Sequence, residues 1–326
     1  MFLSMSDKIR VAVIGVGHMG THHVKAYMAM DRFQIVGIAD TNVSALHSEV
    51  FGVVPRYEKF EDMIREQKPD IVSVCVPAMQ HFAVAAYCLR HECHVLLEKP
   101  VTVRVGEARC LQKITQLTGR QLMVGHIERF NPTISLVKEL VRQEKVGRIH
   151  VVCTIRSGPF PQRMSDVDVR LDLAIHDIDL ANFFLNQYPM HAMCLSKDIG
   201  GHGAADVASY MLEYGDCVAH IHTDWLSSHK RRIIELRGER GTIVADLLLR
   251  NVTVCAEHTE TYTVPNADAL QAEIRYFADM IQAGACVEME HAVKALEVAL
   301  CAHESSNSFI NRIRRTRNQF QLVCKR

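Results

Sequence analysis

The chain has 326 residues, is 48% hydrophobic, and balances 37 basic against 37 acidic side chains. This length suffices for two domains, and the charge balance argues against nucleic acid or a membrane surface as a partner. The chain has eleven cysteines but no Cys-x-x-Cys pair, no signal-peptide pattern and no apolar run of about 20 residues. These features indicate a cytoplasmic protein with reduced thiols.

The first predicted strand, Ile9–Ile14, runs directly into a glycine-rich turn. Gly15 permits the tight turn, Gly17 lets a pyrophosphate approach the backbone, and Gly20 lets the next helix pack closely on the strand. The first N–H groups of that helix then face the phosphates. The turn therefore predicts a dinucleotide site, which also includes His18 and Met19.

The second predicted strand, Gln34–Asp40, ends in a carboxylate about 20 residues beyond the last glycine. A carboxylate at this place binds the hydroxyl groups of the adenosine ribose and repels a 2′-phosphate, so Asp40 favours NAD over NADP as cofactor. Neither Thr41 nor Asn42 is basic, so nothing adjacent would neutralise such a phosphate. The alternative is that Asp40 only caps the next helix.

Further apolar strands alternate with helical patterns up to residue 125. The strands are expected at Ile71–Val76, Val95–Glu98 and Leu122–Val124, and the clearest helices at His81–Leu89 and Gly106–Leu117. Strands that are apolar throughout and separated by helices predict a doubly wound parallel sheet covered on both faces. Ligands of such sheets bind at the carboxyl ends of the strands. We therefore expect Pro77, Glu98, Lys99, Pro100 and His126 to converge on the cofactor crevice. Val76 and His81 are also expected among the cofactor-binding residues.

The pattern changes after residue 126, where strands follow one another. A helix is expected at Asn131–Arg142, a strand at Ile149–Ser157 and a helix at Leu171–Phe184, followed by strands at Ser209–Tyr214, Val218–Trp225, Arg232–Arg237, Thr242–Asp246 and Val252–Ala256. Helices at Ala267–Ala283 and Val287–Ser305 complete the pattern. Strands in succession predict a mostly antiparallel sheet. The sequence thus predicts an α/β Rossmann domain over residues 1–126 and an α+β domain with a large open sheet over 127–326.

Three side chains suit the oxidation of an alcohol. Pro100 restricts the backbone of Lys99 and aims its ammonium across the crevice. Asp172 and His176 are spaced by one helical turn and share a face. Near a nicotinamide, His176 could accept the hydroxyl proton, Lys99 could stabilise alkoxide charge, and Asp172 could orient the imidazole. The alternative is a surface lysine and a histidine packed in the core.

The histidines His220 and His222 share one face of a predicted strand and raise the question of a metal site. Zinc sites combine several Cys, His or acidic ligands at matched spacings. No matched set of further ligands accompanies these two residues in the sequence, so no metal is expected.

Four motifs, in this order, resemble the Gfo/Idh/MocA family, also called the glucose–fructose oxidoreductase or inositol dehydrogenase family. They are the turn AVIGVGHMG, the segment from Pro69-Asp70 to Pro77 and His81, the triplet Glu98-Lys99-Pro100, and Asp172-x-x-x-His176-Asp177-x-Asp179. The resemblance covers nearly the whole chain. It implies an NAD(P)-dependent oxidoreductase of sugars, nucleotide sugars or cyclitols, whose open-sheet domain forms the substrate wall and the oligomer interface. It also implies that Lys99 and His176 are the catalytic pair, with Asp172 joining them.

Two segments are similar to the nucleotide-sugar members of that family, especially the UDP-N-acetylglucosamine 3-dehydrogenases. They are Gly125–Pro132, which reads GHIERFNP, and the stretch from Arg156 to Arg163. Guanidinium groups suit a diphosphate, which a neutral cyclitol does not offer. The alternative for each arginine is an ordinary surface ion pair. The expected substrate-binding residues are His126, Glu128, Arg129, Asn131, Arg156 and Arg163.

We therefore expect a dehydrogenase that oxidises the 3-hydroxyl of UDP-N-acetylglucosamine to a ketone, which an aminotransferase could then use. The alternatives are oxidation of inositol or a free sugar, reduction of a small ketone, and a regulatory protein that binds NAD without turnover. By family analogy, the strand-rich second half predicts a homodimer or a homotetramer.

Overall fold

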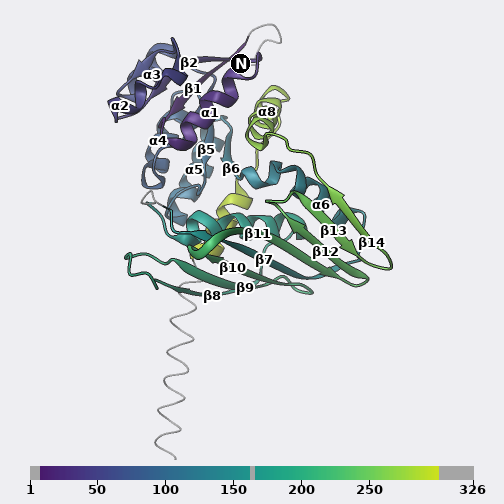
Figure 1. Cartoon of the computed structure of the whole chain (residues 1–326). Helices are drawn as coiled ribbons and strands as arrows, with labels where there is room; N and C mark the ends of the chain where they lie inside the picture. The colour runs from purple at the N-terminus through teal and green to yellow at the C-terminus, as the bar shows by residue number, and fades with distance from the viewer. Residues whose placement is uncertain (1–7, 162–165, 301–326) are drawn as a thin grey trace, which may run out of the picture. The chain divides into compact units, whose positions relative to one another are not determined.

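The computed structural model describes residues 8–161 and 166–300, which divide by their internal contacts into two compact units (Figure 1). Among the described residues, the first unit joins those up to Asn131 to Ala267–Val293, and the second joins those of Pro132–Asn266 to residues 294–300. The sequence places a boundary at residues 126 and 127, close to the first division. It assigns Ala267–Val293 to the second domain, whereas the contacts group this segment with the first unit.

The first unit contains a six-stranded parallel sheet in the order β3-β2-β1-β4-β5-β6. This confirms the predicted doubly wound sheet. Ile14 lies opposite Ala39 and Val74, so β1, β2 and β4 end near one level. β3 carries no periodicity because it has only two residues, one exposed and one half-buried. The strands are β1 (Ile9–Ile14), β2 (Phe33–Ala39), β3 (Arg56–Tyr57), β4 (Ile71–Val74), β5 (His94–Glu98) and β6 (Leu122–Gly125).

Helices pack on this sheet, and one of them comes from late in the sequence. α8 (Ala269–Gln282) brings Ile274 and Phe277 into an apolar core that they share with Tyr27 of α1. Burying each such side chain contributes about 1.5–3 kcal/mol, which explains why this segment belongs with the first unit. The other helices are α1 (His18–Met28), α2 (Val43–Leu46), α3 (Phe60–Gln67), α4 (His81–Arg90) and α5 (Val105–Thr118), with 3-10 turns at Glu49–Phe51, Ala78–Gln80 and Ile127–Phe130.

The second unit contains an eight-stranded sheet in the order β14-β13-β12-β11-β7-β10-β9-β8. All neighbouring strands are antiparallel except β7 and β10, so the mostly antiparallel sheet is confirmed. The sequence did not indicate β8 and β14, which form the two edges and are largely exposed. The strands are β7 (Ile149–Pro159), β8 (His191–Lys197), β9 (Val207–Glu213), β10 (Val218–Asp224), β11 (Leu226–Gly238), β12 (Gly241–Asp246), β13 (Asn251–Cys255) and β14 (Thr259–Thr263).

Helices cover one face of the second sheet. α6 (Pro132–Arg142), a π-helical turn at Arg170–Ala174, and α7 (Ile175–Leu185) all contact its strands. Along β8 and β9 the side chains alternate, with Met193, Leu195 and Met211 on the other face and 49–66% exposed. None of the helices within residues 8–161 and 166–300 is long and apolar enough to cross a bilayer.

Candidate active site

The glycine turn between β1 and α1 has two glycines that the fold requires and one that it does not. A Cβ on Gly15, whose φ is +84°, would lie 2.7 Å from the Cys75 backbone, and a Cβ on Gly20 would lie 1.8 Å from the Gly15 carbonyl oxygen. A Cβ on Gly17, in contrast, would have no protein atom within 4 Å. Gly17 is exposed at the N-cap of α1, where a phosphate can meet free peptide N–H groups. This open approach fits a dinucleotide pyrophosphate.

The carboxylate of Asp40 is bound to the same turn. Its Oδ2 accepts the Val16 N–H at 2.8 Å, and its Oδ1 accepts the Asn42 N–H at 2.8 Å. The N-cap of α2 is Asn42, whose side chain accepts the Ser44 N–H. Capping of the next helix, the alternative explanation for Asp40, is therefore supplied by another residue. Asp40 is half-buried beside the phosphate cradle, as a ribose-binding carboxylate requires.

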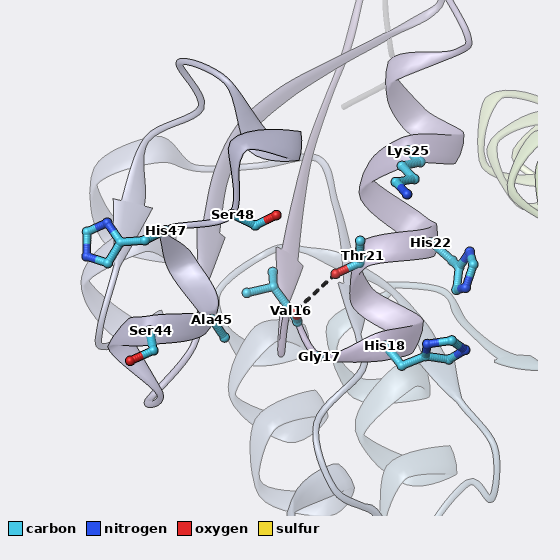
Figure 2. Close-up of a pocket in the computed structure, with 10 residues that line it drawn as sticks. All are labelled: Val16, Gly17, His18, Thr21, His22, Lys25, Ser44, Ala45, His47 and Ser48. Atoms are coloured by element: carbon cyan, nitrogen blue, oxygen red, sulfur yellow. Dashed lines mark hydrogen bonds between the residues drawn. The ribbon is translucent and has the colours of Figure 1, made fainter. Parts of the chain in front are cut away.

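A polar hollow adjoins the cradle between α1 and the segment that follows β2 (Figure 2). Thr21 anchors its α1 wall, since its hydroxyl donates to the Val16 carbonyl at 3.1 Å. His18, expected to bind the cofactor, is exposed at its edge, while Met19 is half-buried and does not line it. The hollow is lined by Val16, Gly17, His18, Thr21, His22, Lys25, Ser44, Ala45, His47 and Ser48.

Lys99 follows the last residue of β5 in a turn whose Lys99–Pro100 peptide is cis. Glu98 is buried beneath this turn: its Oε2 accepts the Lys99 N–H at 3.2 Å, and its Oε1 lies 3.1 Å from His23 Nε2. Burial raises the pKa of Glu98, but the hydrogen bond and charge of His23, with the charge of Lys99, outweigh it, and the net shift is downward. His23 was not among the expected site residues, because it lies among the buried residues of α1 and its position indicates only packing.

Other expected cofactor residues lie in the turn after β4. Val76 and Pro77 precede α4, and His81 is the first residue of that helix. The His81 imidazole is buried, and its two ring nitrogens lie 2.7 Å from the Pro100 carbonyl and 2.9 Å from the Val76 carbonyl. His81 thus joins the segments that follow β4 and β5.

In the second unit, Asp172 and His176 lie where two helical forms meet. The structure is helical over the whole of the expected range Leu171–Phe184, but the first turn is a π-helix at Arg170–Ala174, which continues as α7. Asp172 lies within the π-turn and is half-buried, and His176 is 9% exposed in the first turn of α7. Single π-turns of this kind occur frequently at functional sites.

Arg156 differs from our expectation of a diphosphate ligand. Its guanidinium is buried and forms an ion pair at 2.9 Å with Asp177, which is also buried. A guanidinium already paired with a carboxylate offers little positive charge to a substrate, which disfavours a direct role in binding. Arg163 lies outside the described residues.

The GHIERFNP segment surrounds a 3-10 turn at the carboxyl end of β6. His126 is buried, whereas Glu128, Arg129 and Asn131 are half-buried, and Asn131 Nδ2 donates to Glu128 Oε2 at 3.1 Å. Arg129 is therefore the one described arginine of the expected substrate set with partial access to solvent. The turn packs on α8, where Phe130 and Tyr276 have ring centroids 5.4 Å apart.

The described residues contain no group of three or more His, Cys, Asp or Glu side chains arranged to hold a metal ion. His222 instead contacts its neighbours, with Nε2 3.2 Å from Asp224 Oδ2 and Nδ1 2.9 Å from the Ser209 hydroxyl.

Two family models match the chain. The model described as "Oxidoreductase family, NAD-binding Rossmann fold" matches residues 9–126, and the GFO/IDH/MocA C-terminal domain matches residues 134–244. The chain is 29% identical over 288 residues to a UDP-N-acetylglucosamine 3-dehydrogenase of Acidithiobacillus ferrooxidans, a match that covers 84% of this chain and 89% of that protein. The solved structure of the Acidithiobacillus enzyme superposes with a TM-score of 0.83, covering 92% of this chain and 98% of the other. A myo-inositol 2-dehydrogenase of Thermotoga maritima is 24% identical over 76% of this chain and 78% of its own.

Proposed function

Since the chain belongs to the GFO/IDH/MocA family of NAD-binding oxidoreductases, we propose that it oxidises a secondary hydroxyl of a nucleotide sugar to a ketone. The most specific form of this proposal is the 3-hydroxyl of UDP-N-acetylglucosamine. The family and its NAD cofactor follow from the family models that match both units. The first unit fits NAD because a pyrophosphate can approach the backbone at Gly17 and because the Asp40 carboxylate lies beside this turn. The nature of the sugar is the part that experiment must establish.

Each proposed catalytic residue has a distinct task. His176 accepts the proton of the substrate hydroxyl, because an imidazole titrates near neutral pH. Lys99 donates a hydrogen bond to the same oxygen and stabilises the negative charge that develops on it. Asp172 orients His176 and balances the charge of Lys99. Bound NAD supplies the acceptor for the hydride that leaves the carbon.

One observation supports the nucleotide-sugar assignment: the chain is 29% identical to the Acidithiobacillus enzyme, against 24% to the Thermotoga inositol dehydrogenase. In this chain, the GHIERFNP turn places Arg129 at the carboxyl end of β6 with its side chain partly accessible. A guanidinium there could bind a diphosphate oxygen, and the Glu128–Asn131 pair could bind sugar hydroxyls or the acetamido group. Arg163 is a second candidate for the diphosphate.

The test is mass spectrometry of the purified protein incubated with NAD and a mixture of UDP-sugars and inositols. An aminotransferase and glutamate are added, so that any ketone is converted to an amine and the oxidation is pulled forward. A product derived from UDP-N-acetylglucosamine supports the proposal. A product from a cyclitol or free sugar alone would leave the family assignment intact and overturn the nucleotide sugar.

Substitution tests the residue roles. Lys99→Ala or His176→Ala should lower kcat by about 100-fold or more, the contribution of a positioned acid or base, while the Kd for NAD stays close to that of the wild type. Equal loss of NAD affinity in both variants would contradict these roles.

A second candidate, oxidation of an inositol, is favoured by the similarity to the Thermotoga enzyme. The same mixture of substrates separates the two. An NAD-binding regulatory protein without turnover is a third possibility, and it predicts NAD binding with no product from any sugar in the mixture.

The exposed face of the second sheet supports a further part of the proposal, a homodimer or homotetramer. Met193, Leu195 and Met211 expose apolar side chains on the adjacent strands β8 and β9. Adjacent exposed apolar side chains of this kind can mark a protein–protein interface. Size-exclusion chromatography with light scattering should show an oligomer that Leu195→Glu weakens. A monomeric wild-type protein would refute this assembly.

A further inference from the structure

We propose that two buried histidines, His23 and His81, are positioning residues that hold the Glu98–Lys99–Pro100 turn from its two sides. We call this pair the histidine clamp. The inference rests on the proposed role of Lys99, whose ammonium must be held in place for its hydrogen bond to help the reaction. Neither histidine needs to touch the substrate for this task.

His23 holds the residue before Lys99. It lies on α1, is 1% exposed, and places Nε2 3.1 Å from Glu98 Oε1. The other oxygen of Glu98 accepts the Lys99 N–H at 3.2 Å. The imidazole, the carboxylate and the backbone of Lys99 therefore form one chain of hydrogen bonds.

The far side of the His23 ring is fixed as well. His23 Nδ1 lies 3.1 Å from the Ser73 hydroxyl on β4, and that hydroxyl lies 2.8 Å from the Tyr27 hydroxyl. Ser73 and Tyr27 are both buried, so this anchor is shielded from water. A ring with partners on both nitrogens has a defined orientation, and it passes that orientation to Glu98.

His81 holds the residue after Lys99. Nδ1 lies 2.7 Å from the Pro100 carbonyl oxygen, and Nε2 lies 2.9 Å from the Val76 carbonyl oxygen. A carbonyl oxygen only accepts hydrogen bonds, so a protonated ring nitrogen of His81 donates to the carbonyl that it faces. Because Val76 follows β4 and Pro100 follows β5, His81 joins the ends of two adjacent strands.

Because these buried contacts are polar, they indicate that the two histidines position the turn rather than only fill space in the core. Burying an imidazole or carboxylate costs free energy that an apolar side chain of similar size would avoid. Each histidine places one ring nitrogen against a residue that flanks Lys99. A catalytic group has to be held within about 0.5 Å of its productive place, and restraints on both sides of a flexible lysine provide this.

The first test uses hydrogen–deuterium exchange and needs no substrate. We expect His23→Leu to raise the exchange rate of the Lys99 amide at least roughly tenfold, because Glu98 loses the partner that orients it. His23→Gln, whose amide can still donate to Glu98, should preserve most of the protection. His91→Gln is the control, since His91 is an exposed histidine at the end of α4. Unchanged exchange at Lys99 in the folded His23→Leu protein would overturn the inference.

The second test is steady-state kinetics on the protein's sugar substrate. His23→Leu and His81→Leu should lower kcat at least roughly tenfold and leave KM and the Kd for NAD within about threefold, with the two glutamine variants in between. If the leucine variants do not fold, the glutamine variants carry the same comparison. Loss of thermal stability with unchanged kcat would show that the histidines only pack the core. If Lys99→Ala itself retains full activity, the proposed function fails, whereas the exchange experiment still decides whether the clamp exists.

Discussion

Gly17 and Gly20 should separate cofactor binding from folding. Gly17 has a φ of −62°, outside the left-handed region that favours glycine, and a Cβ there meets no protein atom within 4 Å. Gly17→Ala should therefore change the free energy of unfolding by less than about 1 kcal/mol, the size of an ordinary N-cap effect. The added methyl group fills the space through which a pyrophosphate approaches the turn. We expect the Kd for NAD to rise at least roughly tenfold, which is about 1.4 kcal/mol of binding free energy.

Gly20→Ala should instead lower the stability of the fold. Its Cβ would lie 1.8 Å from the Gly15 carbonyl oxygen, a backbone atom that cannot rotate away, so α1 has to move off the strand. Overpacking of this kind costs about 2–3 kcal/mol and lowers Tm by roughly 4–12 °C. Thermal unfolding followed by circular dichroism gives the stability, and calorimetric titration gives the NAD affinity. The reasoning is refuted if Gly17→Ala binds NAD as well as the wild type, or if it unfolds as early as Gly20→Ala.

Three further substitutions test other parts of the structure. Asp40→Ser should weaken NAD binding and improve the relative affinity for NADP in competition titrations, because it removes the charge that repels a 2′-phosphate. Arg156→Met should lower the free energy of unfolding by about 3–5 kcal/mol in urea, because it leaves Asp177 buried without its cation, and adding Asp177→Asn should restore part of the loss. Burial lowers the pKa of His94 to about 4 from its ordinary 6.5, and its Nδ1 accepts a backbone N–H at 3.0 Å. The unfolded chain therefore takes up a proton between these two values that the folded chain does not, so stability decreases as the pH is lowered from 6.5 to about 4. His94→Gln should reduce this loss by about 2 kcal/mol, and an unchanged acid profile would contradict the assignment.

The sequence predicts those parts of the fold that a local pattern determines. Fully apolar strands divided by helices identify the parallel sheet, and the glycine spacing identifies the turn at Gly15 before any coordinates are known. The edge strands β8 and β14 escape prediction because their side chains are largely exposed and carry little apolar alternation. The sequence predicts α8 as a helix, but it does not predict that Phe277 packs into the core of the first unit, because that packing depends on contacts between distant parts of the chain.

The residues of the candidate site likewise fall into those that a local motif predicts and those that only tertiary contacts reveal. Motif spacing identifies Lys99, Asp172 and His176 as candidates, because the chemistry is encoded in residue type and interval. The buried partner of Arg156 is harder to foresee: Asp177 is close in sequence to His176, yet only the fold brings it to β7. The role of His23 was not predicted for the same reason, because its partner Glu98 is 75 positions away in the chain. Partners of this kind come from tertiary contacts, for which a single sequence has no local signal.

Glu273 allows the electrostatics around Glu98 to be tested by stability alone. α8 buries its carboxyl completely, and neither oxygen has a hydrogen-bond partner among the described residues. Burial and the charge of Glu98 raise the pKa of Glu273 well above 4.5, so the folded protein keeps a proton that the unfolded chain releases. Stability should therefore fall by about 1.4 kcal/mol for each pH unit above the ordinary pKa of a glutamate, until the folded pKa is reached.

Glu273→Gln removes this titration and keeps the shape of the side chain. Urea unfolding at several values between pH 5 and 8 should give a flatter profile for the variant, which becomes the more stable protein toward the upper end. Glu139→Gln is the matched control, because Glu139 is an exposed carboxylate of α6 whose pKa is lowered to about 2 by its hydrogen bonds with Arg142 and Gln143, so it does not titrate in this range. Parallel profiles for wild type and Glu273→Gln would mean that Glu273 is ionised in the fold. Glu98 and Glu273 would then both be charged in the buried interior, and the partners of Glu98, which are His23 and Lys99, would also have to offset the repulsion between the two carboxylates.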